Sequence, residues 1–314
     1  MTDPDRRAPA GAALDPGFWE AVLAQGGIVP TDRRLDDMTV ELVELLGDLD
    51  PHLRDDLALT ILLRWIAAGV YDDLLPAMGD GISEGLRPGL GEDGTPSVLR
   101  RSFSARVLAA VIDRDNVLHG MHREAVLRWG DRGLSWLLAE RDLRGHVPGA
   151  GRAAAMEHGA ELLRAMAESR HLQADGLGVL LDALAERLLR PTPHAFSGQE
   201  ADHLAYSAMT VLHRDAVEPV FLQAWIDHLA VAWRPHSEDD PGEPNGLVPA
   251  RVRNTVAFAR ALHLQLLLGV RPSAGREPFP GPPAARVEVL GALQAALRSS
   301  GPHFEPGRLP GSRR

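Results

Sequence analysis

The sequence predicts an all-α protein of about twelve helices in antiparallel pairs, stacked as an α-solenoid of the HEAT or armadillo kind. Apolar residues recur at helical spacing along nearly the whole chain, and alternating, strand-like runs are hard to find. Successive helix pairs begin near Pro51, Ser97, Gly151 and Gln199, about 46 to 54 residues apart, and the repeats of such solenoids have a period of roughly 40–47 residues. An irregular helical bundle is the alternative arrangement.

The clearest helix is expected over residues 51–68. Asp50 is placed to cap it, Pro51 stands at its first position, and Gly69 follows its last turn. One apolar stripe runs along the helix and is formed by Leu53, Leu57, Ile61, Trp65 and Ala68. Arg54 is expected to lie largely off this stripe, because helical spacing turns it away.

The same signals predict the other helices in order. Residues 14–27 repeat the start and stop signals on a shorter scale. Further helices are expected near residues 36–46, 72–85, 97–113, 120–140, 152–168, 173–190, 200–213, 216–234, 250–269 and 283–299. Together they predict one domain over residues 14–299. The proline-, glycine- and charge-rich ends, residues 1–13 and 300–314, are expected to be disordered.

Two missing residue types limit the chemistry. The chain has no cysteine, which excludes disulfides, thiolate nucleophiles and cysteine metal sites. It also has no lysine, which excludes Schiff-base chemistry, the phosphate-loop lysine and the kinase lysine. The formal net charge of −10 disfavours a protein that binds nucleic acid broadly, since backbone binding needs clustered cations.

Targeting and membrane signals are weak. The first residues are acidic and contain no apolar run, so they do not form a secretory signal. The longest apolar-looking segment, residues 256–270, carries Arg260 and His263 and is too short to span a bilayer. We expect a soluble cytoplasmic protein without a membrane partner. The acidic loop at residues 235–246 is either a docking element for a basic partner or a solvated face.

The segment GAGRAAAMEHGAELL, residues 149–163, carries the strongest functional signals. Gly149, Gly151 and Ala154 match the G-x-G-x-x-A spacing of a dinucleotide-binding turn, and a helix follows. That fingerprint requires a buried strand directly before it, whereas a charged helix end and a proline precede this turn. We therefore predict that no cofactor binds here and that the glycines form a flexible start to the helix.

His158 and Glu161 are expected on one flank of this helix. At 100° per residue, the stripe that faces the core consists of Ala155, Gly159, Leu162 and Met166. His158 lies at the edge of that stripe with Glu161 on the same flank, while Glu157 points almost the opposite way. Two ligands from one helix are too few for a structural zinc, so no metal is predicted. His158 is either a hydrogen-bonded packing residue between helices or a metal or proton-transfer group.

Two other glutamate–histidine pairs have a spacing that suits metal sites. Glu168-x-x-His171 and Glu200-x-x-His203 match the spacing of di-iron bundles, in which two such pairs and two further glutamates converge. His171 lies near a predicted helix end. We therefore expect that the two pairs do not converge.

Residues 140–169 resemble a bacterial family of helical proteins known as domain of unknown function 2785. In that family an arginine–glycine–aromatic–valine turn leads through glycines into a helix that starts with tryptophan. The helix carries two histidines four residues apart and an acidic residue three further on. The matching residues here are Arg144, Gly145, Val147, Gly149, Gly151, His158, Gly159 and Glu161. His146 replaces the aromatic residue, Arg152 the tryptophan and Ala154 the first histidine.

The resemblance implies an all-helical, repeat-like fold and no particular activity. The family's histidines and acid suit a metal or a buried polar network on one flank of the helix. Without the first histidine, at Ala154, a site with three ligands from this helix is incomplete. The resemblance therefore marks the flank of His158 and Glu161 as the place to examine.

Two functional hypotheses follow. The leading one is a non-enzymatic scaffold that binds a protein or peptide along one face of the helical repeats, since no complete catalytic set is found. The alternative is a small-ligand-binding or enzymatic pocket around residues 144–161. There Arg144 would orient an anionic ligand, His158 would act as acid or base, and Glu161 would orient His158. This alternative expects His158 to open into a cleft near Arg144. The candidate functional residues are Arg144, Gly149, Gly151, His158 and Glu161.

Overall fold

The predicted all-helical class is confirmed by the computed structural model, which describes residues 15–233, 248–271 and 279–300. Within them the chain forms twelve α-helices: α1 (Pro16–Ala24), α2 (Leu35–Leu45), α3 (Thr60–Ala67), α4 (Leu75–Glu84), α5 (Ser97–Leu118), α6 (Arg123–Ala139), α7 (Ala155–Glu168), α8 (Ala174–Leu189), α9 (Glu200–Leu212), α10 (Pro219–Ala230), α11 (Ala250–Leu268) and α12 (Arg286–Arg298). Three short elements complete the helical set: the π-helical η1 (His52–Leu59) and the 3-10 turns η2 (Asp72–Leu74) and η3 (Val231–Trp233). The described sheet has two strands, β1 (His146–Val147) and β2 (Gly151–Arg152).

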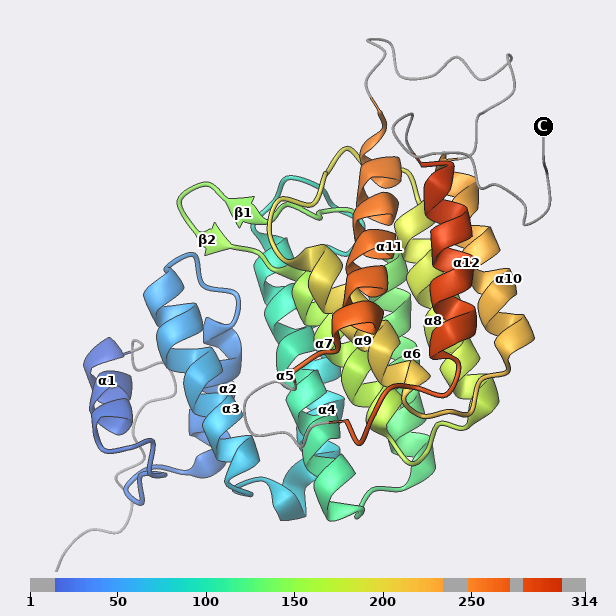
Figure 1. Cartoon of the computed structure of the whole chain (residues 1–314). Helices are drawn as coiled ribbons and strands as arrows, with labels where there is room; N and C mark the ends of the chain where they lie inside the picture. The colour runs from blue at the N-terminus through green and yellow to red at the C-terminus, as the bar shows by residue number, and fades with distance from the viewer. Residues whose placement is uncertain (1–14, 234–247, 272–278, 301–314) are drawn as a thin grey trace, which may run out of the picture.

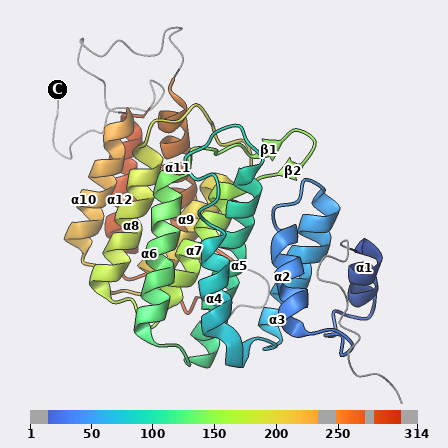
Figure 2. The same ribbon diagram turned by 180° about the vertical axis from the view of Figure 1, so that it is seen from behind.

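The helices from α3 onwards alternate between two layers. In one layer α3, α5, α7, α9 and α11 follow one another side by side, and Figure 1 shows α5, α7, α9 and α11 towards the viewer. In the other layer α4, α6, α8, α10 and α12 follow in the same order, and most of these helices face the viewer in Figure 2. Helices α1 and α2 pack against η1 at one end of the molecule. The two layers agree with the predicted pairing of consecutive helices, while their winding as a solenoid stays a prediction.

The predicted helix over residues 51–68 is formed by η1 and α3 together. The carboxylate of Asp50 accepts a hydrogen bond from the backbone N–H of His52 at 2.9 Å, so the predicted cap is present. Gly69 ends the helix with a φ of 83°. Arg54, expected off the apolar stripe, is nevertheless fully buried. The loop after β1 covers this side of the helix, and the Arg54 Nη2 donates to the carbonyl of Ala150 at 2.8 Å.

Helix α7 is the most enclosed helix of its layer. It lies between α5 and α9 and also packs against α6 in the other layer. Glycine makes the contact with α6 close: a Cβ on Gly159 would lie 2.8 Å from the Leu137 Cδ1, and one on Gly133 would lie 2.5 Å from the Leu162 Cδ2. Gly159, which the sequence places on the core-facing stripe, therefore lies in a close helix–helix contact. All side chains of α7 are buried except those of His158, Glu161 and Glu168.

Several predictions concern segments outside this part of the chain. The tail at 1–13, nearly all of the tail at 300–314 and the acidic loop at 235–246 lie outside the described residues, so the boundaries at 14 and 299 stay predictions. Among the described helices, none has the length and apolar character needed to cross a membrane.

Candidate functional site

The glycine turn is the tip of a β-hairpin, not the direct start of the helix. His146 pairs with Arg152, and Val147 pairs with Gly151, in antiparallel register. Gly149 and Gly151 adopt φ values of 78° and 80°, which glycine tolerates without strain. The sequence prediction missed this hairpin because two-residue strands are too short to show an alternating pattern.

This hairpin differs from a dinucleotide-binding turn. Such a turn follows a buried strand of a parallel sheet, whereas the described residues contain only the antiparallel pair β1–β2. The turn docks on the N-terminal helices: a Cβ on Gly151 would lie 3.1 Å from the Pro51 Cγ. In a dinucleotide-binding turn the first turn of the helix faces a phosphate. Here that turn carries the acidic Glu157, which accepts a hydrogen bond from the Arg152 Nη2 at 2.6 Å. The glycines thus shape a structural contact between the hairpin and η1.

His158 is on α7, faces α5 and is half-buried. Its Nδ1 is 2.9 Å from the Ser102 Oγ and 3.1 Å from the Ser102 carbonyl oxygen, and its ring meets the Phe103 ring edge-on at 4.8 Å. The Ser102 hydroxyl donates its one proton to the carbonyl of Ala153. The proton between His158 and Ser102 must therefore be on Nδ1 of the histidine, which leaves Nε2 as the unprotonated nitrogen.

The protonation of His158 is also shifted. Burial, followed by the positive charges of Arg106 and Arg152, lowers its pKa to about 3. The imidazole is therefore neutral at pH 7, and its Nε2 makes no hydrogen bond within the described part of the chain. A general acid or base works best when its pKa is near the working pH, so this histidine is poorly suited to proton transfer at neutral pH.

Glu161 connects α7 to α9. Its Oε1 lies 3.6 Å from the Nδ1 of His203, and its Oε2 accepts a hydrogen bond from the Arg164 Nε at 3.0 Å. Burial alone would raise the pKa of Glu161, but the bond with His203 and the charges of Arg164 and Arg106 outweigh it and lower the pKa to about 2. The bond with Glu161 in turn raises the pKa of His203.

These contacts define a polar strip across three neighbouring helices. It consists of Arg106 on α5, His158 and Glu161 on α7, and His203 on α9. Within the strip His158 contacts α5 and Glu161 contacts α9, and a charge interaction links the two side chains. The sequence did not identify Arg106, and it grouped His203 with a metal motif. The missing signal was the order of helices in the layer, which brings α5 and α9 to either side of α7.

Arg144 lies in a different cluster. Its Nε and Nη2 donate to the two oxygens of Asp142 at 2.8 and 2.6 Å, and its Nη2 also reaches the carbonyl of Thr95. The bond with Asp142 raises the pKa of Arg144 further. No contact within the described residues joins Arg144 to His158. The partners of Arg144 are therefore Asp142 and Thr95, whereas His158 is bound to Ser102.

The cluster around Arg144 also contains possible metal ligands. Ligand atoms of Asp93, Asp142 and His194 lie within 4.8 Å of one another. However, Asp142 accepts bonds from Arg144 on both oxygens and one from the backbone N–H of Gly94 at 3.1 Å. Asp93 binds the Nε2 of His194 at 2.8 Å. The guanidinium of Arg144 therefore already supplies the cation that this carboxylate needs, and a metal would have to displace it.

The two glutamate–histidine motifs do not meet at one site. Glu168 accepts a hydrogen bond from Arg164 at 3.0 Å, whereas His171 lies 3.6 Å from Asp115. Glu200 accepts bonds from backbone N–H groups just before α9, at Ser197 and Gly198. Their roles in this structure are therefore ion pairing and helix capping, as helical termini commonly require.

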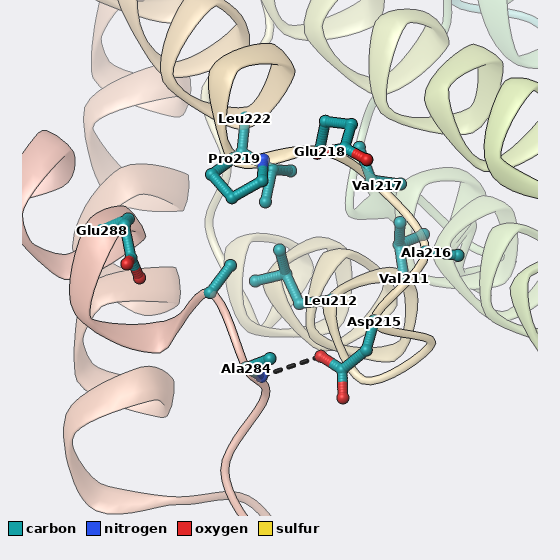
Figure 3. A pocket seen from close by; sticks show the side chains of 11 residues that line it. Val211, Leu212, Asp215, Ala216, Val217, Glu218, Pro219, Leu222, Ala284 and Glu288 are labelled. Carbon is teal, nitrogen blue, oxygen red and sulfur yellow. Dashed lines mark hydrogen bonds between the residues drawn. The ribbon is translucent and has the colours of Figure 1, made fainter.

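A separate cavity lies between the α9–α10 connection and the start of α12 (Figure 3). It has a volume of about 210 Å³ and is lined by Val211, Leu212, Asp215, Ala216, Val217, Glu218, Pro219, Leu222, Ala284, Ala285 and Glu288. The Asp215 Oδ1 accepts a hydrogen bond from the backbone N–H of Ala284 at 2.8 Å (Figure 3). Asp215 thus fastens the segment before α12. None of the predicted site residues lines this cavity.

Comparison with known proteins gives one match. A family model described as "Protein of unknown function (DUF2785)" matches residues 86–264, more than half of the chain. The matched region includes α5, α7 and α9 and therefore the whole polar strip. No curated protein and no solved structure matches the chain.

Proposed function

The chain belongs to this family of proteins of unknown function, and we propose that it is a non-enzymatic scaffold that binds a protein or peptide across the layer of α5, α7 and α9. One observation carries the proposal. Helix α7 is buried along its length except at His158, Glu161 and Glu168, so the surface that this helix offers to a partner consists of polar side chains. The predicted solenoid belongs to the same proposal, because stacked helix pairs present such a continuous face.

The polar strip suits an extended partner. Helices within a layer are about 8–10 Å apart, so a strip over three helices spans roughly 20 Å. An extended peptide advances about 3.3 Å per residue and would cover this span with roughly six residues. The strip offers both signs of charge, Arg106 and Glu161, and an unprotonated nitrogen at His158. A peptide with alternating polar groups would find donors and acceptors that are already held in place.

The alternative, an enzymatic or small-ligand pocket around residues 144–161, has less support. Ser102 is fully buried and donates to Ala153, so it is not placed as a nucleophile for His158. The guanidinium of Arg144 is already bound to Asp142, which leaves it less available to an anionic ligand. The pKa of about 3 at His158 also disfavours proton transfer at neutral pH.

Affinity capture with matched variants tests the scaffold. The strip variant is Arg106→Glu, which reverses one charge on α5. The control is Arg128→Glu on α6, an exposed arginine in the other layer. We expect the wild type and the control to retain the same partner and the strip variant to lose most of it, with all three folded by circular dichroism.

Two results would contradict the proposal. One is retention of the partner by Arg106→Glu, which would place the binding surface elsewhere. The other is a small metabolite, identified by mass spectrometry on the purified protein, that is released by His158→Asn. That result would favour the ligand pocket, because a partner-binding face has no reason to retain a metabolite.

A further inference from the structure

A cavity in the other layer combines a buried arginine with an excess of positive charge. It has a volume of about 520 Å³ and lies where α6 and α8 end, two helices that are adjacent in Figure 2. Leu138 and Ala139 from the last turn of α6 line it, as do Arg187 from the last turn of α8 and the segment 190–193. The polar strip is on α5, α7 and α9, so this cavity is a separate feature.

Arg187 is buried without an anionic partner. Its side chain is 5% exposed, and its Nη1 donates to the backbone carbonyl of Glu140 at 2.7 Å. Its Nε is buried and has no hydrogen-bond partner, and its Nη2 makes no hydrogen bond within the described residues. The Glu140 carboxylate does not serve Arg187, because it is bound to Arg101 at 2.6 and 2.8 Å. A buried donor without an acceptor is destabilising, so this unpaired Nε calls for an explanation.

The surroundings of Arg187 add positive charge. Arg141 and Arg190 also line the cavity. Its lining acids are Glu140, whose carboxylate is bound to Arg101, and Asp93, which binds His194. The carbonyl ends of α6 and α8 contribute about half a negative charge each. Three arginines therefore exceed the local negative charge by roughly one unit. Burial, together with the like charge of Arg190, lowers the pKa of Arg187 to about 10.

Helix capping explains only part of this arrangement. Arginines are common at helix C-termini, where they bind the last carbonyls, and the Nη1 of Arg187 makes such a contact. That role does not require a buried Nε, because an arginine exposed to water can also bind the last carbonyls of a helix. The uncapped part of Arg187 is the edge formed by Nε–H and Nη2–H, which is the edge that binds oxyanions in a bidentate manner.

We propose that the cavity binds a small organic molecule through an oxyanion, a carboxylate or a phosphate, held by the guanidinium of Arg187. Arg190 and Arg141 supply further positive charge at the rim. Leu138, Ala139 and Pro191 provide apolar wall for the body of the ligand. The volume lies within the range of small-molecule sites, roughly 300–1,000 Å³.

The test is a binding titration at low ionic strength with three probes: inorganic phosphate, phenyl phosphate and benzoate. We expect saturable binding of at least one probe by calorimetry. Arg187→Met should weaken that binding at least tenfold, whereas Arg128→Met, which removes one charge from α6 outside the cavity, should leave it unchanged. A preference for phenyl phosphate or for benzoate identifies the anion, and a gain over inorganic phosphate shows that the apolar wall contributes.

A second variant protects the test against a folding defect. Arg190 is exposed, so Arg190→Met should fold normally and weaken binding several-fold. The proposal is overturned if no probe binds saturably with a Kd below about 10 mM, which corresponds to a binding free energy of about 3 kcal/mol. It is also overturned if a folded Arg187→Met binds as tightly as the wild type or, where that variant does not fold, if Arg190→Met does.

Discussion

Arg164 on α7 and Arg187 on α8 are almost equally buried, at 1% and 5% exposed, but their partners differ completely. Arg164 donates to Asp113, Glu161 and Glu168, at distances of 2.6 to 3.0 Å. Burial alone would lower its pKa, but these carboxylates outweigh burial and raise it. Arg187 binds a single carbonyl, and burial lowers its pKa to about 10.

The difference shows that burial of a charge does not by itself indicate function. The α7 side of the molecule supplies every partner that Arg164 requires, so its charges hold α5 and α7 together. The α8 side leaves donors of Arg187 unused next to a cavity. An incomplete set of partners at a buried group points to a ligand, whereas a complete set points to a structural role.

The largest expected effect is on stability. Arg164→Met leaves three carboxylates around an apolar side chain, so we expect the free energy of unfolding to fall by about 3–5 kcal/mol. Arg187→Met removes a buried charge that has no acid partner, so the free energy of unfolding should stay within about 1 kcal/mol of the wild type or rise. Urea denaturation of both variants at pH 7 measures the contrast. Equal losses would mean that Arg187 has partners comparable to those of Arg164.

The next effect concerns pH and His158. Its folded pKa of about 3 is below the unfolded value of 6.5, so the unfolded chain binds the proton first as the pH falls. The associated stability is complete above pH 6.5 and decreases as the pH falls towards 3. This amounts to about 2 kcal/mol between pH 8 and pH 5.

His158→Asn isolates this contribution. The asparagine amide nitrogen occupies the place of Nδ1 and keeps the donor to Ser102, but it does not titrate. Denaturation of the wild type and the variant at pH 8 and pH 5 should show the smaller pH dependence in the variant. If the wild type and the variant lost the same stability between pH 8 and pH 5, the folded pKa of His158 would be close to its unfolded value, as the enzymatic alternative requires.

Local sequence signals predicted the helices well. Features that depend on contacts between helices were not predicted. Caps and periodicity lie within a few residues of each helix, so helices such as α3 and α7 were placed closely. The 100° step within one helix drew attention to His158 and Glu161, but their partners, Ser102 on α5 and His203 on α9, come from neighbouring helices. Arg106 and Arg187 were not predicted, because their significance depends on which helices are adjacent and on which donors stay without acceptors. The position of Arg144 depended on a loop contact with Asp142, which helical periodicity does not encode.

The smallest expected effect is at the other histidine of the polar strip. Glu161 raises the pKa of His203 above its unfolded value. Its stabilisation is therefore complete below pH 6.5 and is lost as the pH rises through the raised pKa, which is opposite to His158. His203→Gln should lower the free energy of unfolding by about 0.5–1 kcal/mol at pH 6 and by less at pH 9. The same loss at both pH values would show that packing, not the charge on His203, connects α9 to Glu161. Charge pairing would then contribute to stability around Arg164 but not between His203 and Glu161 in the polar strip.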